Sequence, residues 1–386
     1  MISAPVLALV GLTAAGGFSP EFSTDPAVVS TTSQGQGAPL VAFDGTNYLV
    51  VWSDGRHGII PDGTGAFTYE SDVFATRVTP SGVVLDPEGI PIATARKNQH
   101  PTHVGFDGTN YLVVWNENPP ASAESDIYAA RVSPAGVVLG TTPIAVSTSS
   151  SDSGGAVAFD GTNFLVVYSL QGQTLVAVRI SKAGVILDTT PIAITTLTTS
   201  SATGPVAAFD GTNFLVGWVD TRNYNTTSFD IFAARVTPAG TVLDPNGFAV
   251  CTQTGGQQAL TEACGGGQCL LAWADPRTSG TQKIYAARVS GQGAVLDATG
   301  IAVATSTNGT GFPATAYDGT NFMVTWQEDR SGGYDILAAR VSPAGALLDS
   351  TPAAVSAANA FQENPGIAFD GTNYFVAWGD NRGPTG

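Results

Sequence analysis

An acid–x–arginine triplet is the most repeated charged pattern in this chain. The acid lies two residues, and the arginine four residues, after the aromatic residue that ends an aliphatic run. The five copies are Asp54 and Arg56, Asp220 and Arg222, Asp275 and Arg277, Glu328 and Arg330, and Asp380 and Arg382. A planar guanidinium can hold two acceptors at once, so the simplest interpretation is a set of ion pairs that staple loops or join repeats. The alternative is a polyvalent ligand-binding site made by all five triplets.

Other residues that could do chemistry are few. Of the three histidines, His100 and His103 share a segment without a nearby carboxylate, so the sequence predicts no metal site there. Asp-Gly turns recur at Asp44, Asp107, Asp160, Asp210, Asp318 and Asp370. Each turn offers one carboxylate, whereas calcium takes about six to eight oxygens, so we expect these aspartates to bond to their own backbone. No cofactor and no catalytic residue are predicted, with calcium as the alternative left open.

Two of the three cysteines, Cys264 and Cys269, replace the aromatic pair that flanks the turn in other repeats, such as Phe43 and Tyr48. Residues that face each other across a short hairpin lie within disulfide reach. The sequence therefore predicts a Cys264–Cys269 disulfide and an oxidising compartment, the alternative being two buried thiols. Cys251 is expected to be a small core residue.

These residues belong to a repeat that spans the whole chain. Variants of Phe-Asp-Gly-Thr-Asn-Tyr-Leu-Val-Val-Trp begin at Phe43, Phe106, Phe159, Phe209, Cys264, Tyr317 and Phe369, at intervals of 50 to 63 residues. One repeat contains strand-like segments at 101–106, 111–115, 126–132 and 137–139, the last continuing to 144–146. Four antiparallel strands in about 50 residues are typical of a propeller blade. We predict an all-β fold, one seven-bladed β-propeller of four-stranded blades over residues 1–386.

The two ends of the chain are expected to complete the seventh blade. Residues 11–18 align with Arg131–Val138, and residues 26–31 align with Pro143–Thr148, so residues 1–31 would supply the outer strands that the C-terminus lacks. Such closure leaves no open sheet edge. In the alternative interpretation, the apolar stretch within residues 1–15 is the remnant of a signal peptide, although no basic residue precedes it.

Charge narrows the range of partners. The formal net charge is −16 with three lysines, Lys97, Lys182 and Lys283. Such a surface cannot neutralise a run of phosphates, so neither nucleic acid nor an anionic membrane is an expected partner. No segment is long and apolar enough to predict insertion into a membrane.

The hairpin pattern predicts that the recurring Asp-Gly-Thr-Asn and Ser-Pro-Ala-Gly turns lie on one face of the disc. The variable loops, which are the second-to-third connections and the links between blades, would lie on the other face. The longest variable loop, Ser53 to Ser71, carries His57, Phe67, Tyr69 and Glu70 and is the first candidate for a binding loop. A propeller glycosidase would need carboxylates converging on its channel. The innermost strands, such as Ala38–Ala42, Thr102–Gly105 and Gly155–Ala158, are expected to carry none.

The seven motif copies and the Ala-Ala-Arg-Val-Ser-Pro-Ala-Gly hairpins resemble the repeats of secreted and cell-surface bacterial β-propellers, over residues 22–386. The chain is also distantly similar to lectin and integrin-type propellers, which bind ligands on loops, although it lacks the Asp-x-Asp calcium loops of the latter. The resemblance implies an extracellular or cell-surface binding or adhesion module that recognises glycans or surface proteins. A glycoside hydrolase-like enzyme is the alternative.

Overall fold

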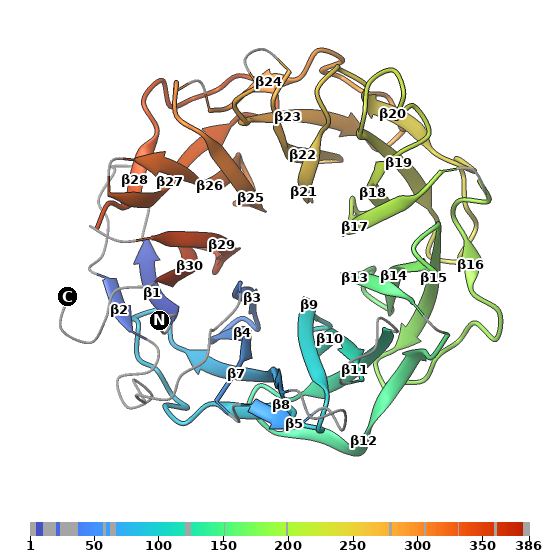
Figure 1. Cartoon of the computed structure of the whole chain (residues 1–386), viewed down its shortest axis with the longest axis vertical. Helices are drawn as coiled ribbons and strands as arrows, with labels where there is room; N and C mark the ends of the chain where they lie inside the picture. The colour runs from blue at the N-terminus through green and yellow to red at the C-terminus, as the bar shows by residue number, and fades with distance from the viewer. Residues whose placement is uncertain are drawn as a thin grey trace.

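The computed structural model describes residues 5–10, 21–23, 38–56, 59–61, 67–119, 125–149, 151–197, 200–277, 280–304, 306–330, 332–358 and 361–380. This part of the chain contains strands and no helix, and so no helix that could cross a membrane. The strands form a propeller of four-stranded antiparallel sheets around a central axis (Figure 1).

Six sheets, numbered here as blades 1 to 6, are each built from strands that follow one another in the chain. Blade 1 contains β3 (Leu40–Phe43), β4 (Tyr48–Asp54), β7 (Asp72–Val78) and β8 (Ile90–Ala93). Blade 2 contains β9 (Asn98–Phe106), β10 (Tyr111–Asn118), β11 (Asp126–Val132) and β12 (Val138–Ser147). Blade 3 contains β13 (Ser153–Phe159), β14 (Asn163–Leu170), β15 (Thr174–Ser181) and β16 (Ile192–Ala193).

The second half of the chain repeats this order. Blade 4 contains β17 (Ala202–Phe209), β18 (Phe214–Asp220), β19 (Asp230–Val236) and β20 (Phe248–Cys251). Blade 5 contains β21 (Gln258–Gly265), β22 (Gln268–Asp275), β23 (Lys283–Ser290) and β24 (Ile301–Ala302). Blade 6 contains β25 (Thr310–Tyr317), β26 (Phe322–Arg330), β27 (Gly333–Val341) and β28 (Ala353–Ser356).

A further four-stranded sheet, the terminal sheet, combines strands from both ends of the chain. Its order is β2 (Glu21–Ser23), β1 (Pro5–Val10), β30 (Tyr374–Asp380) and β29 (Gln362–Phe369). Figure 1 shows it between blade 6 and blade 1, and its innermost strand β29 contacts the innermost strands of both. The two ends therefore share one sheet, as the sequence predicts.

The register of the terminal strands differs from the sequence alignment. Val10 pairs with Tyr374 in the way that Val132 pairs with Tyr111, so the alignment of residues 11–18 was wrong by two residues. The outer strand is β2, where Phe22 pairs with Leu7, whereas the segment predicted for it, 26–31, lies outside the described residues. The terminal segment lacks the arginine that marks the end of the third strand elsewhere, which explains the misalignment. The apolar stretch considered as a signal peptide forms β1 where it is described, and residues 1–4 and 11–15 are not described.

The second strand of each blade is apolar on both faces because a neighbouring sheet covers each face. In β10, Tyr111, Val113 and Trp115 join a core cluster with blade 1, while Leu112 and Val114 join a cluster with blade 3. All five side chains are fully buried. Burial on both sides removes the alternation expected of a half-exposed strand, which confirms the interpretation of these aliphatic runs.

The arginine that ends the third strand links successive blades. Arg77, Arg179, Arg235, Arg288 and Arg340 each bind an aspartate nine residues later, at 2.7 or 2.8 Å. Four of them also donate to a backbone carbonyl in the turn of the next blade, those of Pro134, Pro238, Gly291 and Pro343. In blade 2 the aspartate is replaced by Gly140, and Arg131 donates to the Lys182 carbonyl of the next blade. In five blades this arginine therefore forms an ion pair within its own blade.

Candidate functional site

The strand register places the variable loops together on one face of the disc. Tyr111, at one end of β10, pairs with both Phe106 and Val132, so the first-to-second and third-to-fourth turns share a face. Glu117, at the other end, pairs with Gln99 and Asp126. The second-to-third connections and the links between blades therefore lie opposite the turns, on what we call the loop face.

The acid–x–arginine triplets lie at the loop face, each at the end of a second strand. In blade 4, Trp218 Nε1 donates to Asp220 at 2.8 Å, and Arg222 Nε and Nη2 donate to the same carboxylate at 2.9 and 2.7 Å. Arg222 also donates to the Asn246 carbonyl at 2.8 Å, and its guanidinium lies 3.8 Å from the Phe232 ring centre. One carboxylate thus joins the buried tryptophan to the arginine and, through it, to the segment that leads into the fourth strand, β20.

The same ion pair occurs in three other blades. Distances are 2.6 Å for Asp54–Arg56, 2.5 Å for Asp275–Arg277 and 3.1 Å for Glu328–Arg330. In the terminal sheet Trp378 donates to the buried Asp380, whereas Arg382 lies outside the described residues. The hydrogen bonds from Arg56 and Trp52 outweigh burial and hold the pKa of Asp54 below its usual range.

This geometry is that of loop staples. The five acids are buried, at 0 to 2% exposure, so the part of a triplet that reaches the surface is the arginine edge. Blade 2 uses another pair, with Lys97 Nζ at 2.6 Å from Glu117, and blade 3 has no triplet. These ion pairs hold the ends of the loops in place, and contact between their arginines and a ligand stays a prediction.

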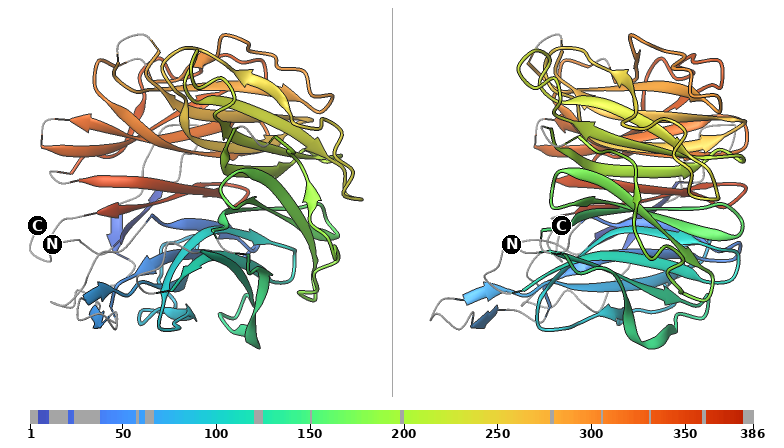
Figure 2. Two further views of the ribbon diagram at one scale, coloured as in Figure 1. Left: turned by 45° about the vertical axis from the view of Figure 1, so that its right-hand side comes forward. Right: turned by 90° about the vertical axis from the view of Figure 1, so that its right-hand side faces the viewer.

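The longest loop contains a small hairpin, β5 (Ile59–Pro61) with β6 (Phe67–Tyr69), that projects from the disc (Figure 2). Phe67 and Tyr69 lie on β6, and their side chains are not described; His57 lies outside the described residues. Glu70, which follows the hairpin, is buried. The sequence therefore located a projecting element, and its role in binding stays a prediction.

The turn aspartates bond to their own backbone. In each of the six Asp-Gly turns, Oδ1 accepts from the amides two and three residues later, at 2.6 to 2.8 Å. The described residues hold no group of three or more His, Cys, Asp or Glu side chains that could bind a metal ion.

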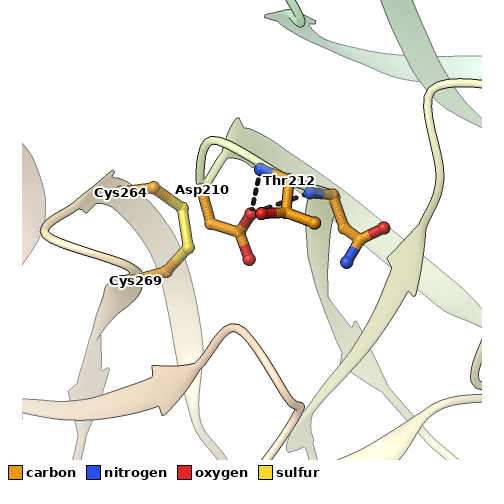
Figure 3. Close-up of a disulfide and its surroundings, with 5 residues drawn as sticks. Asp210, Thr212, Cys264 and Cys269 are labelled. Atoms are coloured by element: carbon orange, nitrogen blue, oxygen red, sulfur yellow. Dashed lines mark hydrogen bonds between the residues drawn. A yellow bond between two sulfur atoms is a disulfide. The ribbon is translucent and has the colours of Figure 1, made fainter.

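The disulfide between Cys264 and Cys269 is present, and it closes a hairpin beside the Asp210 turn of blade 4 (Figure 3). Gly265 pairs with Gln268, which leaves Gly266 and Gly267 as a two-residue turn with φ of 63° and 78°. A type I′ turn requires positive φ at both of its central residues, which glycine adopts without strain. Gly265 is needed for a different reason, because a Cβ there would collide with the Tyr317 ring of blade 6.

Replacing Cys264 by serine should loosen blade 5 locally without unfolding the protein. The loop that the bond closes is short, so its loss should cost about 2 kcal/mol or less. Hydrogen exchange followed by mass spectrometry should rise in peptides covering β21 and β22 and stay unchanged elsewhere. The reduced wild-type protein should show the same local increase in exchange as the variant. Faster exchange in every blade would contradict the expectation.

Residues on or next to the innermost strands of all seven sheets line a cavity of about 630 Å³. The innermost strands of blades 3 to 6 and of the terminal sheet each contain a register shift. Each shift carries one residue of positive φ, namely Gly154, Gly204, Ala259, Phe312 and Asn364. Bulges of this kind redirect side chains and are frequent beside functional sites. Four of these residues are small or polar, Phe312 being the exception, and all five line the cavity.

Sequence reasoning missed two carboxylates on these strands. The expectation that innermost strands carry none holds for the three segments named for it, but is wrong for Glu262 on β21 and Glu363 on β29. Glu262 lines the cavity wall, and both of its oxygens are buried without a hydrogen-bond partner. Burial raises the pKa of Glu262 well above its usual range. The signal was a single residue that breaks the apolar repeat, visible at the position where blades 1 to 3 have valine.

Comparison with known proteins supports the fold alone. No family model and no curated protein matches the sequence. The β-propeller domain of the trilobed protease from Pyrococcus furiosus is similar at 11% identity and a TM-score of 0.50, over 90% of this chain and 96% of that one. Prolyl endopeptidases are similar at 14% identity and a TM-score of 0.51, where 90% of this chain spans 45% of theirs.

Proposed function

We propose that this chain is an extracellular or cell-surface binding or adhesion module that recognises glycans or surface proteins through its loop face. Its frame would be one seven-bladed propeller over residues 1–386, with the terminal sheet closing the ring. The pairing of β1 with β30 along six residue pairs supports this closure. The Cys264–Cys269 disulfide supports a location outside the reducing cytosol.

One observation favours binding over hydrolysis. Among the described residues that line the cavity, Glu262 is the one carboxylic acid, and its oxygens are shielded from solvent. A glycosidase of the usual kind needs two carboxyl groups that flank the scissile bond. The cavity can therefore hold a ligand, but it lacks the acid–base pair that would cleave a sugar.

The loop face is suited to recognition because its loops differ from blade to blade and are held at their ends by buried ion pairs. The buried acids fix the start of each stapled connection, while the connections differ in length and sequence from blade to blade. Binding residues are often found on such loops, held by a rigid scaffold. Several similar sites around a ring would also strengthen weak single contacts.

We expect the protein to retain glycans or a surface protein without converting them. Incubation with a panel of labelled oligosaccharides should leave every oligosaccharide intact, while a glycan array or a cell-surface pull-down should show retention. A variant without residues 57–69 tests the hairpin, and should lose part of the binding. Turnover of any oligosaccharide without retention would instead support the glycoside hydrolase-like alternative.

A further inference from the structure

Phe312 on β25 combines two unfavourable features in one residue. Its side chain is 54% exposed, and its backbone has a φ of 49°, in the left-handed region. A bulky residue in this region is a conformational outlier, and its backbone is strained. The equivalent residues of the other repeats are Ala38, Pro101, Gly154, Gly204, Ala259 and Asn364. No other repeat has an aromatic residue at this position, so the structure of the repeat does not explain the phenylalanine.

The exposed ring lies in the wall of the central cavity. Leu260 of blade 5 and Asn364 of the terminal sheet line the same cavity from the two sheets that flank blade 6. The backbone N–H of Asn364 donates to Gln327 Oε1 of blade 6 at 2.9 Å, which holds this part of β29 in place. Thr261 and Thr315 add hydroxyls from blades 5 and 6, 3.1 Å apart. An aromatic ring thus lies among polar groups contributed by neighbouring sheets.

Phe312 lies at the end of the cavity wall that is nearer the loop face. The lining in blade 6 begins at Phe312, two residues after Thr310, and Thr310 pairs with Glu328 at the loop-face end of β26. The residues of the Asp-Gly turns, at the opposite face, are not part of the described lining. A ligand would therefore reach Phe312 from the loop face.

The charge of the lining selects an uncharged ligand. No lysine or arginine is among its described residues, so an anion would find no counter-charge, and the net charge of −16 would repel it. A cation would find no accessible carboxylate, because the oxygens of Glu262 are buried. His103 also lines the cavity, and burial lowers its pKa to about 4, so it is neutral at pH 7.

We propose that the central cavity binds an uncharged saccharide, with Phe312 as the platform on which one sugar ring stacks. The C–H groups on a face of a pyranose carry partial positive charge and are attracted to the negative face of an aromatic ring. Asn364 and the two threonines supply donors and acceptors for hydroxyl groups, as in pockets where a few polar groups orient a ligand. This inference rests on the proposed binding function and places a saccharide site in the channel.

The test uses the Phe312→Gly variant of the full chain. Glycine occupies this position in blades 3 and 4, so the variant should fold with an unchanged or raised melting temperature. Wild-type protein and variant are compared by titration against neutral gluco-, galacto-, manno-, xylo- and arabino-oligosaccharides. At least one should bind the wild type, and its affinity should fall tenfold or more in the variant. Val185→Ala shortens an apolar side chain that is 57% exposed in a third-to-fourth turn, on the face opposite the loop face and outside the cavity lining, and should leave the affinity unchanged.

Three outcomes would overturn the inference: no neutral oligosaccharide binds, only charged glycans or peptides bind, or Phe312→Gly binds as tightly as the wild type. Binding that is lost without residues 57–69 but unchanged in Phe312→Gly would overturn the cavity site and leave the proposed function standing. If Phe312→Gly fails to fold, Phe312→Asn replaces it, since the terminal sheet has asparagine at this position.

Discussion

Replacing Arg277 by alanine should lower the free energy of unfolding by about 3–5 kcal/mol, because it leaves a buried carboxylate without its cation. The side chain of Asp275 is fully buried and that of Arg277 is 9% exposed. Trp273 Nε1 would still donate to Asp275, but the charge would lose its counter-ion. The stacking of the guanidinium at 3.9 Å from the Tyr285 ring centre would also be lost. Urea unfolding followed by tryptophan fluorescence measures the change.

Blade 6 offers a matched control for this variant. Arg330 occupies the same position after its tryptophan, but its side chain is 46% exposed and lies 3.1 Å from Glu328. Glu328 is also buried, but water screens a guanidinium that is half exposed, so Arg330→Ala should cost less than Arg277→Ala. Equal losses in the two variants would show that burial does not decide the strength of the staples.

The repeat made most of the frame predictable. Apolar residues on both faces of segments such as Tyr111–Trp115 required cover on both sides, and the recurring turns fixed the strand order. The disulfide could be predicted because two cysteines replace the facing aromatic pair of the other repeats. The staples followed from the spacing of acid and arginine, because that spacing recurs at the same strand end.

The parts that sequence reasoning missed are those where one repeat departs from the others. The register of β1 was wrong because the segment has no arginine to mark the end of the third strand. The left-handed backbone at Phe312 could not be foreseen from a phenylalanine, which avoids that conformation elsewhere. Glu262 was overlooked because it stands in an apolar column of the repeat. A repeat thus predicts what its copies share, whereas the candidate ligand site depends on what they do not share.

Glu262 gives the second large expected effect, since replacing it by valine should stabilise the protein. At the same position blades 1 to 3 have Val41, Val104 and Val157, and Val157 lies against Gly105 of the preceding blade. Glu262 lies against the equivalent residue, Ala208, with both oxygens buried and unpartnered. An unsatisfied buried polar group costs about 1–3 kcal/mol, so Glu262→Val should raise the free energy of unfolding by that amount at pH 8.

The gain should depend on pH in a definite direction. Because burial raises the pKa of Glu262 in the folded protein, folding favours its protonated form. Its contribution to stability is fully present below the ordinary glutamate pKa of about 4.3 and is lost as the pH rises through the raised value. The difference between Glu262→Val and the wild type should therefore be smallest at pH 5 and grow towards pH 8 in urea titrations. Glu262→Gln, which keeps the size and cannot ionise, should remove this pH dependence. A gap that stays constant from pH 5 to pH 8 would mean that the carboxyl group is not buried as the structure places it.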